Sequence, residues 1–155
     1  MSIESSHTSV VIPVFNRRRM VVECLESVAA QTRPPAHVTV VDDGSTDGTA
    51  DAVQTWMVAR SDSDRWHLVR LTANVGASHA RNRGTGQAST AEFVAFLDSD
   101  DLWPPDFLAR AEGTLSADSE LVAVTADIRI ARRDRPATRR DLSVMSHRIS
   151  DVLFR

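Results

Sequence analysis

Two acidic clusters have the residue types and spacing that could bind a divalent cation or a polar ligand. One is Asp42-Asp43-Gly44-Ser45, and the other is Asp98-Ser99-Asp100-Asp101. Crowded carboxylates repel one another, and a hard cation such as Mg²⁺ or Mn²⁺ is one way to offset that repulsion. The alternative is that these aspartates only shape loops and cap helices. Two clusters at one edge of a sheet would favour the ligand-binding interpretation.

The spacing within each cluster suggests which side chains face a ligand. In an extended segment alternate residues point to the same side, so Asp98 and Asp100 are expected to share one ligand while Ser99 turns away. Asp43 is expected at the tip of a strand, where its carboxylate could accept a hydrogen bond from the ring N–H of a base such as uracil. Asp42 is expected to be structural.

The elements that must position these clusters alternate between strands and helices. Apolar, β-branched runs predict buried strands, and apolar residues at helical spacing predict amphipathic helices between them. The strands are predicted over residues 9–15, 37–43, 66–71, 92–98 and 121–130, and the helices over about 17–31, 49–60, 76–88 and 104–115. This order predicts an α/β, Rossmann-like, mostly parallel sheet with helices on both faces. Ligands bind beyond the carboxyl ends of such strands, where both acidic clusters are expected.

Composition excludes several classes of mechanism. The chain has 155 residues, which suggests one domain. All 18 basic residues are arginines, so chemistry that needs a lysine, such as Schiff-base formation or the kinase lysine, is excluded. A net charge of −3 gives no indication of nucleic-acid binding. With one cysteine, no apolar run of membrane-spanning length and no signal-peptide pattern, the expected location is the cytoplasm.

Four segments in order along the chain carry a family resemblance. They are VVIPVFNR (10–17), VVDDGSTDGT (40–49), NVGASHARNRG (74–84) and FLDSDD (96–101). Over about residues 8–130 the chain resembles the family-2 glycosyltransferases of the GT-A fold. The resemblance implies a nucleotide-diphosphate sugar donor, most often UDP-linked, and Mn²⁺ or Mg²⁺ as cofactor. It also implies transfer of the sugar to an acceptor hydroxyl with inversion.

The resemblance also implies roles for individual side chains. The implied binding residues are Pro13, Phe15, Asp43, Arg81, Asp98 and Asp100. Pro13 and Phe15 would line the base pocket, and Asp43 would bind the base. Asp98 would lie near the ribose and Arg81 near the nucleotide or the diphosphate. Asp100 would be the main metal ligand, with Asp101 helping to position the metal or the donor sugar.

The chain departs from the family after its donor-binding part. Residues 1–130 are interpreted as the nucleotide-sugar domain, and residues 131–155 as a basic extension that begins a truncated acceptor half. The acceptor would be an unknown carbohydrate, lipid-linked or other hydroxyl compound. The family's catalytic base lies in a later segment, and Asp127 is the nearest candidate here. The alternative function is a non-catalytic nucleotide-sugar binding module that lacks the base.

Charge is distributed unevenly along the chain. Residues 1–128 carry 10 arginines and 18 acids, whereas residues 129–155 carry 8 arginines and 3 acids. The basic end is expected to be a solvated surface, with peripheral contact to an anionic membrane or an acidic partner as the alternative. A signalling receiver domain is disfavoured because its acid pair would follow the first strand and it needs a lysine. A sugar nucleotidyltransferase is disfavoured because no glycine-rich loop follows the first strand.

Overall fold

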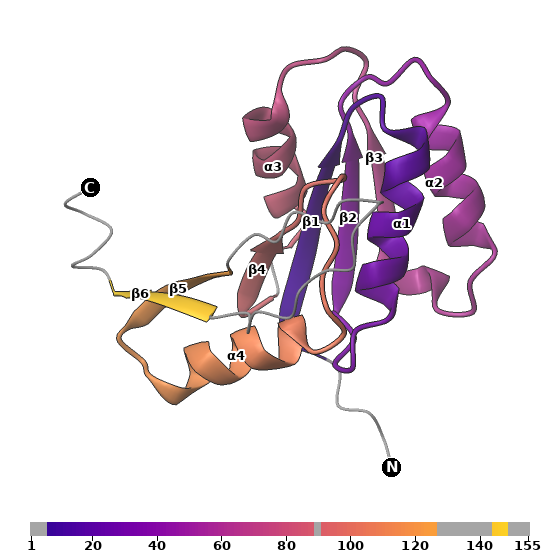
Figure 1. Ribbon diagram of the computed structural model, residues 1–155. Coiled ribbons are helices and arrows are strands. Elements are labelled where there is room, and N and C mark those ends of the chain that lie inside the picture. Colours follow the sequence, from indigo (N-terminus) through magenta and orange to yellow (C-terminus); the bar gives the residue numbers. More distant parts are fainter. Residues whose placement is uncertain (1–5, 89–90, 127–143, 149–155) are drawn as a thin grey trace, which may run out of the picture. The chain divides into compact units, whose positions relative to one another are not determined.

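A four-stranded parallel sheet positions the loops that carry the acidic residues (Figure 1). The computed structural model describes residues 6–88, 91–126 and 144–148. The strand order is β3-β2-β1-β4. The strands are β1 (Thr8–Val14), β2 (His37–Asp42), β3 (Trp66–Arg70) and β4 (Phe93–Phe96). All three pairings are parallel, so the carboxyl ends of the strands lie at one edge.

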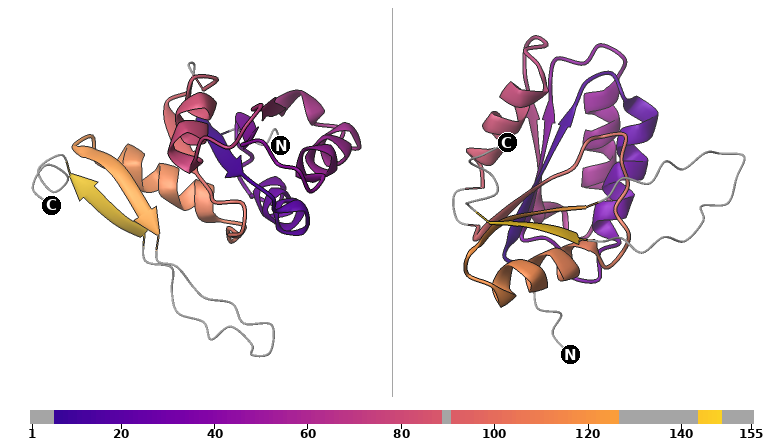
Figure 2. Two further views of the ribbon diagram at one scale, coloured as in Figure 1. Left: turned by 90° about the horizontal axis from the view of Figure 1, so that it is seen from above. Right: turned by 60° about the vertical axis from the view of Figure 1, so that its left-hand side comes forward.

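Helices cover both faces of this sheet, as the sequence predicts (Figure 2, left). Helices α1 (Arg18–Ala29) and α2 (Thr49–Val58) pack on one face, and α3 (Ala77–Thr85) packs on the other. A short 3₁₀ turn over Ser63–Arg65 precedes β3. The two helical layers explain why the strands read as continuous apolar runs, because both faces of β1 and β2 are buried.

The core lies mainly between the sheet and the α1–α2 layer. Val10, Ile12, Val38 and Val40 are fully buried there beneath the apolar stripe of α1. The other face has a closer helix contact, because α3 places Gly84 directly on Val11 of β1. Because helices cover both faces of the sheet, the loops at the strand ends are its accessible part.

The chain divides into two units, residues 1–109 and 110–155, and the division falls within α4 (Phe107–Ala117). In the second unit β5 (Leu121–Ala126) pairs antiparallel with β6 (Val144–Arg148). The predicted strand over residues 121–130 therefore begins where expected and is described as far as Ala126. The apolar pattern did not predict β6, and the basic segment 127–143 lies outside the described residues.

The fourth strand is shorter than its apolar run. The pattern predicts a strand over residues 92–98, whereas β4 pairs with β1 only over Phe93–Phe96. Leu97 still donates its backbone N–H to Val11, and the chain then turns at Asp98. Within the described ranges, no helix is both long and apolar enough to span a bilayer.

Candidate functional site

A cleft of about 490 Å³ lies at the carboxyl ends of the parallel strands. It is formed by loops that are far apart in the sequence and that the sheet brings together. Its lining residues are Pro13, Val14, Phe15, Arg17, Asp43, Asn74, Gly76, Ala77, Arg81, Asp98, Ser99 and Asp100. The six binding residues expected from the sequence, from Pro13 to Asp100, are all among them. Both acidic clusters thus contribute to one cleft.

Asp43 is a buried carboxylate that organises the loop after β3. It is 3% exposed, and its two oxygens accept hydrogen bonds from the backbone N–H groups of Val75 (2.9 Å) and Gly76 (2.8 Å). Its own backbone N–H donates to Val14 at the end of β1 (2.8 Å). Each carboxylate oxygen has a further lone pair, so Asp43 keeps acceptor capacity for a ligand in the cleft. Asp42 is structural, because its Oδ2 accepts the backbone N–H of Ser45.

A glycine lets two loops approach each other beside Asp43. Gly44 has a φ of +75°, and a Cβ there would lie 2.6 Å from the backbone carbonyl carbon of Ala73. A side chain at this position would therefore clash with the loop after β3 as well as strain the backbone. Gly44 therefore allows both the turn after Asp43 and the close approach of the loop after β3. That loop contributes Asn74 and Gly76 to the cleft.

The second acidic cluster is a tight turn. The backbone N–H of Asp101 donates to the carbonyl of Asp98 (2.9 Å), so the segment is not extended. The strand alternation on which the expected orientation of Ser99 was based is therefore absent, although Ser99 is buried whereas Asp98 and Asp100 are exposed. Ser99 is also among the residues that line the cleft. Asp98 and Asp100 nonetheless both line it. Each pairs with an arginine there: Asp98 with Arg81, and Asp100 with Arg17 at 2.9 Å.

Negative charge is concentrated around this turn. Burial raises the pKa of Asp101 above its usual range, and the charges of Asp100 and Asp98 raise it further. The thiol of Cys24 lies beneath the turn and donates to the carbonyl of Asp98 (3.7 Å). Burial, with the neighbouring carboxylates, raises the pKa of Cys24 to about 12, so this thiol is inert at neutral pH.

These oxygen donors fit a hard divalent cation that takes few protein ligands. Among the residues the structure describes, no three His, Cys, Asp or Glu side chains are placed to hold a metal ion by themselves. Mg²⁺ in particular is usually bound by one or two carboxylates, with water and substrate phosphates completing its shell. A turn in which the charges of Asp100 and Asp98 raise the pKa of Asp101 is chemically suited to such a cation.

The end of α1 and the residues just after it hold the segment that follows the acidic turn. Gln31 is buried, donates through Nε2 to the carbonyl of Pro104 (2.7 Å), and accepts the backbone N–H of Leu108 (2.9 Å). Ser27 accepts the backbone N–H of Trp103 (3.2 Å). The segment after the turn is thus held by Ser27 of α1 and by Gln31 just beyond the end of that helix.

Sequence reasoning missed Arg17 as a member of the site. Its signal was a basic residue directly after the first strand, at the edge where ligands bind. Phe15 is 41% exposed and Pro13 is buried, and both line the cleft, so Phe15 is not a core residue. Asp127, the candidate base, lies outside the described residues.

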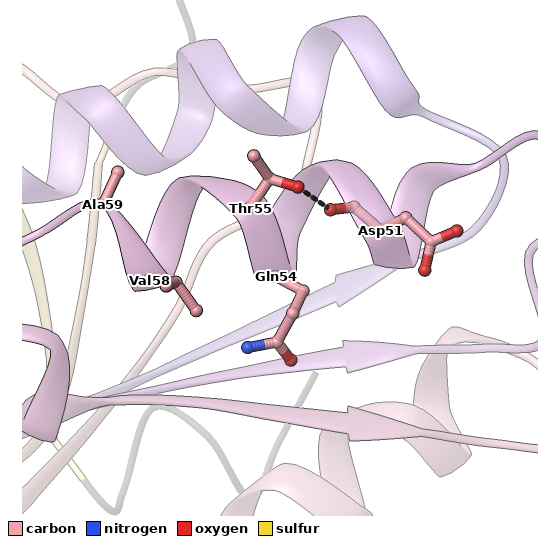
Figure 3. A pocket seen from close by; sticks show the side chains of 5 residues that line it. All are labelled: Asp51, Gln54, Thr55, Val58 and Ala59. Atoms are coloured by element: carbon pink, nitrogen blue, oxygen red, sulfur yellow. Dashed lines mark hydrogen bonds between the residues drawn. The ribbon is translucent and has the colours of Figure 1, made fainter.

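A second hollow, of about 450 Å³, lies on α2 (Figure 3). It is lined by Asp51, Gln54, Thr55, Val58 and Ala59, and Thr55 donates to the backbone carbonyl of Asp51 (2.8 Å). All five residues belong to one helix and its end, and loops from other elements do not converge on it. The cleft at the strand ends is therefore the candidate site.

Comparison with known proteins identifies the family to which this chain is similar. The family model "Glycosyl transferase family 2" matches residues 9–152. The Bacillus subtilis glycosyltransferase TuaG, named for teichuronic acid biosynthesis, is 40% identical over 102 residues, which cover 66% of this chain and 39% of that protein. The chain thus spans about two fifths of the length of this curated relative.

Two solved structures share the fold and are about as similar to this chain in sequence as each other. The mannosyltransferase PcManGT from Pyrobaculum calidifontis, in complex with GDP-Man and Mn²⁺, has a TM-score of 0.69 and 35% identity, with 76% of this chain and 34% of that chain covered. S. aureus TarS 1–349 in complex with UDP-GlcNAc has a TM-score of 0.66 and 28% identity, with 85% and 37% covered. With the family model matching almost the whole sequence, the chain belongs to glycosyl transferase family 2 and has the GT-A fold.

Proposed function

We propose that the cleft binds a nucleotide-diphosphate sugar and that the chain takes part in transferring the sugar to an acceptor hydroxyl. The observation that carries the proposal is that residues from four separate segments line one cleft: Pro13 and Phe15, Asp43, Arg81, and Asp98 and Asp100. The family and its solved members support it, since PcManGT was solved with GDP-Man and TarS with UDP-GlcNAc. The donor we propose is UDP-linked, with a GDP-linked sugar as the alternative.

Each side chain has a defined part in this proposal. Phe15 and Pro13 offer an apolar surface to the base, and Asp43 offers it a carboxylate acceptor. Asp98 lies near the ribose. Arg81, already in the cleft, is suited to the diphosphate, because guanidinium groups bind phosphate oxygens in pairs.

Asp100 is the residue that would hold a divalent cation. Such a cation would offset the negative charge that develops on the leaving diphosphate. In an inverting transfer the acceptor oxygen attacks the anomeric carbon while the bond from that carbon to the diphosphate breaks. The acceptor proton then needs a base, for which Asp127 remains our candidate.

Nucleotide binding tests the metal-dependent part of this proposal. UDP and GDP are titrated calorimetrically with and without Mn²⁺ on the wild type, on Asp100→Asn, and on Asp64→Asn, an exposed aspartate away from the cleft, as the control. One nucleotide should bind at least about tenfold more tightly with Mn²⁺, and Asp100→Asn alone should lose this gain, which corresponds to about 1.4 kcal/mol or more. Equal affinities with and without Mn²⁺ in all three proteins would refute it.

Release of nucleotide separates an enzyme from a binding module. Wild-type protein is incubated with UDP-GlcNAc or GDP-Man and Mn²⁺, and free nucleotide is measured over time. Slow donor hydrolysis that is lost in Asp100→Asn supports the transferase. Tight donor binding without nucleotide release supports the non-catalytic alternative.

A further inference from the structure

Arg17 forms an ion pair with Asp100, the carboxylate that the proposed function assigns to a divalent cation. Its Nη1 lies 2.9 Å from Oδ2 of Asp100. A guanidinium at that distance neutralises the anion in the molecule without ligands. It would also repel a divalent cation that approached the same carboxylate. Arginine and cation therefore compete for one charge.

The backbone at Arg17 is fixed from the neighbouring loop. Asn16 has a φ of +50°, donates its N–H to Ser45 Oγ (2.9 Å), and accepts the N–H of Thr46 at its own Oδ1 (2.9 Å). The N–H of Arg17 donates to Thr49 Oγ1 (3.0 Å). The point from which the Arg17 side chain leaves the backbone is thus held at the rim of the cleft.

The guanidinium itself is only lightly held. The Arg17 side chain is 43% exposed and that of Asp100 is 38% exposed, and ion pairs this exposed contribute little to stability. Within the part of the chain that the structure describes, the Arg17 guanidinium also donates to the Met20 sulfur, at 3.6 Å. Because the Arg17 backbone is fixed and its guanidinium is only weakly paired, the guanidinium can change partners without any movement of the backbone. Arg17 also lines the same cleft as Arg81, so a diphosphate bound there would lie within one cavity with both arginines.

We propose that Arg17 exchanges partners during donor binding: it neutralises Asp100 in the free protein and binds the donor's diphosphate once a divalent cation takes Asp100. This inference rests on the proposed function, because it needs a nucleotide diphosphate and a cation in the cleft. It goes beyond that function by assigning Arg17 to the coupling between the two ligands. Coupling of this kind is reciprocal, so each ligand strengthens the binding of the other.

Four variants test the exchange: Arg17→Gln, Asp100→Asn, the double variant, and Arg19→Gln as the matched control. Arg19 is an exposed arginine of α1 that does not line the cleft. Mn²⁺ affinity without nucleotide is measured from the electron paramagnetic resonance signal of free Mn²⁺. UDP and GDP affinities are measured calorimetrically with and without Mn²⁺, and circular dichroism with thermal denaturation verifies that each variant folds.

The exchange predicts a distinctive pattern. Arg17→Gln should bind Mn²⁺ alone about fivefold to tenfold more tightly, because one competing charge is removed. The same variant should bind the nucleotide at least about tenfold more weakly with Mn²⁺, yet within about twofold of wild type without it. In the Asp100→Asn background Arg17 has no carboxylate to neutralise, so Arg17→Gln should then weaken nucleotide binding even without Mn²⁺. Arg19→Gln should match the wild type in every measurement.

Three outcomes would overturn the inference while leaving the proposed function intact. The first is an equal loss of nucleotide affinity in Arg17→Gln with and without Mn²⁺, which would indicate a fixed phosphate ligand. The second is no loss in either condition, which would indicate an ordinary surface ion pair. The third is unchanged Mn²⁺ affinity. Absence of UDP and GDP binding to the wild type with Mn²⁺ would instead refute the proposed function, and the inference with it.

Discussion

At the scale of single residues, the carboxylates in and beside the cleft differ in the groups that they bind. Asp42 and Asp43 are adjacent and equally buried, yet one accepts a turn N–H and the other holds a neighbouring loop. Asp98 and Asp100 instead keep half-exposed carboxylates paired with arginines. Burial and hydrogen-bond partners, rather than residue type, therefore separate the buried acids that hold loops from the exposed acids that pair with arginines.

Asp43→Asn should destabilise the fold and weaken nucleotide binding. An amide offers one oxygen where the carboxylate offers two, so one of the N–H groups of Val75 and Gly76 would face an NH₂ group. A buried donor left without its acceptor costs about 1–3 kcal/mol. The measurement is the free energy of unfolding in urea together with calorimetric titration of UDP.

The exposed Asp64→Asn variant controls for the loss of one charge, and it should unfold like the wild type. Wild-type stability in Asp43→Asn would mean that the two hydrogen bonds do not hold the loop.

Asp47→Asn should lower stability at neutral pH but not at acid pH. Hydrogen bonding from the Thr49 hydroxyl lowers the pKa of Asp47, and backbone N–H groups of Arg18 and Thr49 lower it further. A lowered folded-state pKa means that the stabilisation is present above the unfolded pKa of about 3.9 and is lost as pH falls through the folded value. Thermal melts of both proteins from pH 7 to pH 2 should therefore differ by a few degrees at first and then converge. A difference that is constant with pH would contradict this origin.

At the scale of elements, the sequence predicts the sheet and its helices because burial dictates the pattern. Continuous valine runs in β1 and β2 follow from helices on both faces. The same runs do not show where pairing stops, so β4 ends at Phe96 although the apolar run reaches Leu97. Strand β6 lies in a sequence with no clear period, and its antiparallel pairing with β5 depends on a partner that local pattern does not reveal.

Two glycine substitutions, one in α3 and one in α4, should have opposite effects on stability. A methyl group on Gly84 would overlap Val11 Cγ1 and lie 3.2 Å from Val41 Cγ2, so Gly84→Ala should cost about 1–3 kcal/mol despite alanine's better helix propensity. Gly113 in α4 is exposed, and a methyl group added there would meet no atom of the described residues within 4 Å, so Gly113→Ala should stabilise by up to about 1 kcal/mol.

Urea denaturation of both variants beside the wild type measures this contrast. A stabilising Gly84→Ala would show that α3 does not press on β1 as closely as described.

At the scale of the whole molecule, the sequence predicts that the two acidic clusters share one cleft, because strand topology brings their loops together. Parallel strands place their following loops at one edge, so Asp43 and Asp100 meet although they are far apart along the chain. Topology does not determine how those side chains pair. The ion pair of Arg17 with Asp100 and the hold of Asp43 on the loop after β3 depend on turn geometry that no spacing rule contains.

The left-handed backbone at Asn16 has a consequence for redesign of this protein. Its conformation is held by Ser45 and Thr46, so the direction in which the next side chain leaves the backbone is determined by a loop from another strand. If only the segment after β1 were replaced by one from another protein, its arginine would lack the loop after β2 that orients Arg17 here. An engineer who wishes to retune donor preference would need to transplant the two loops together.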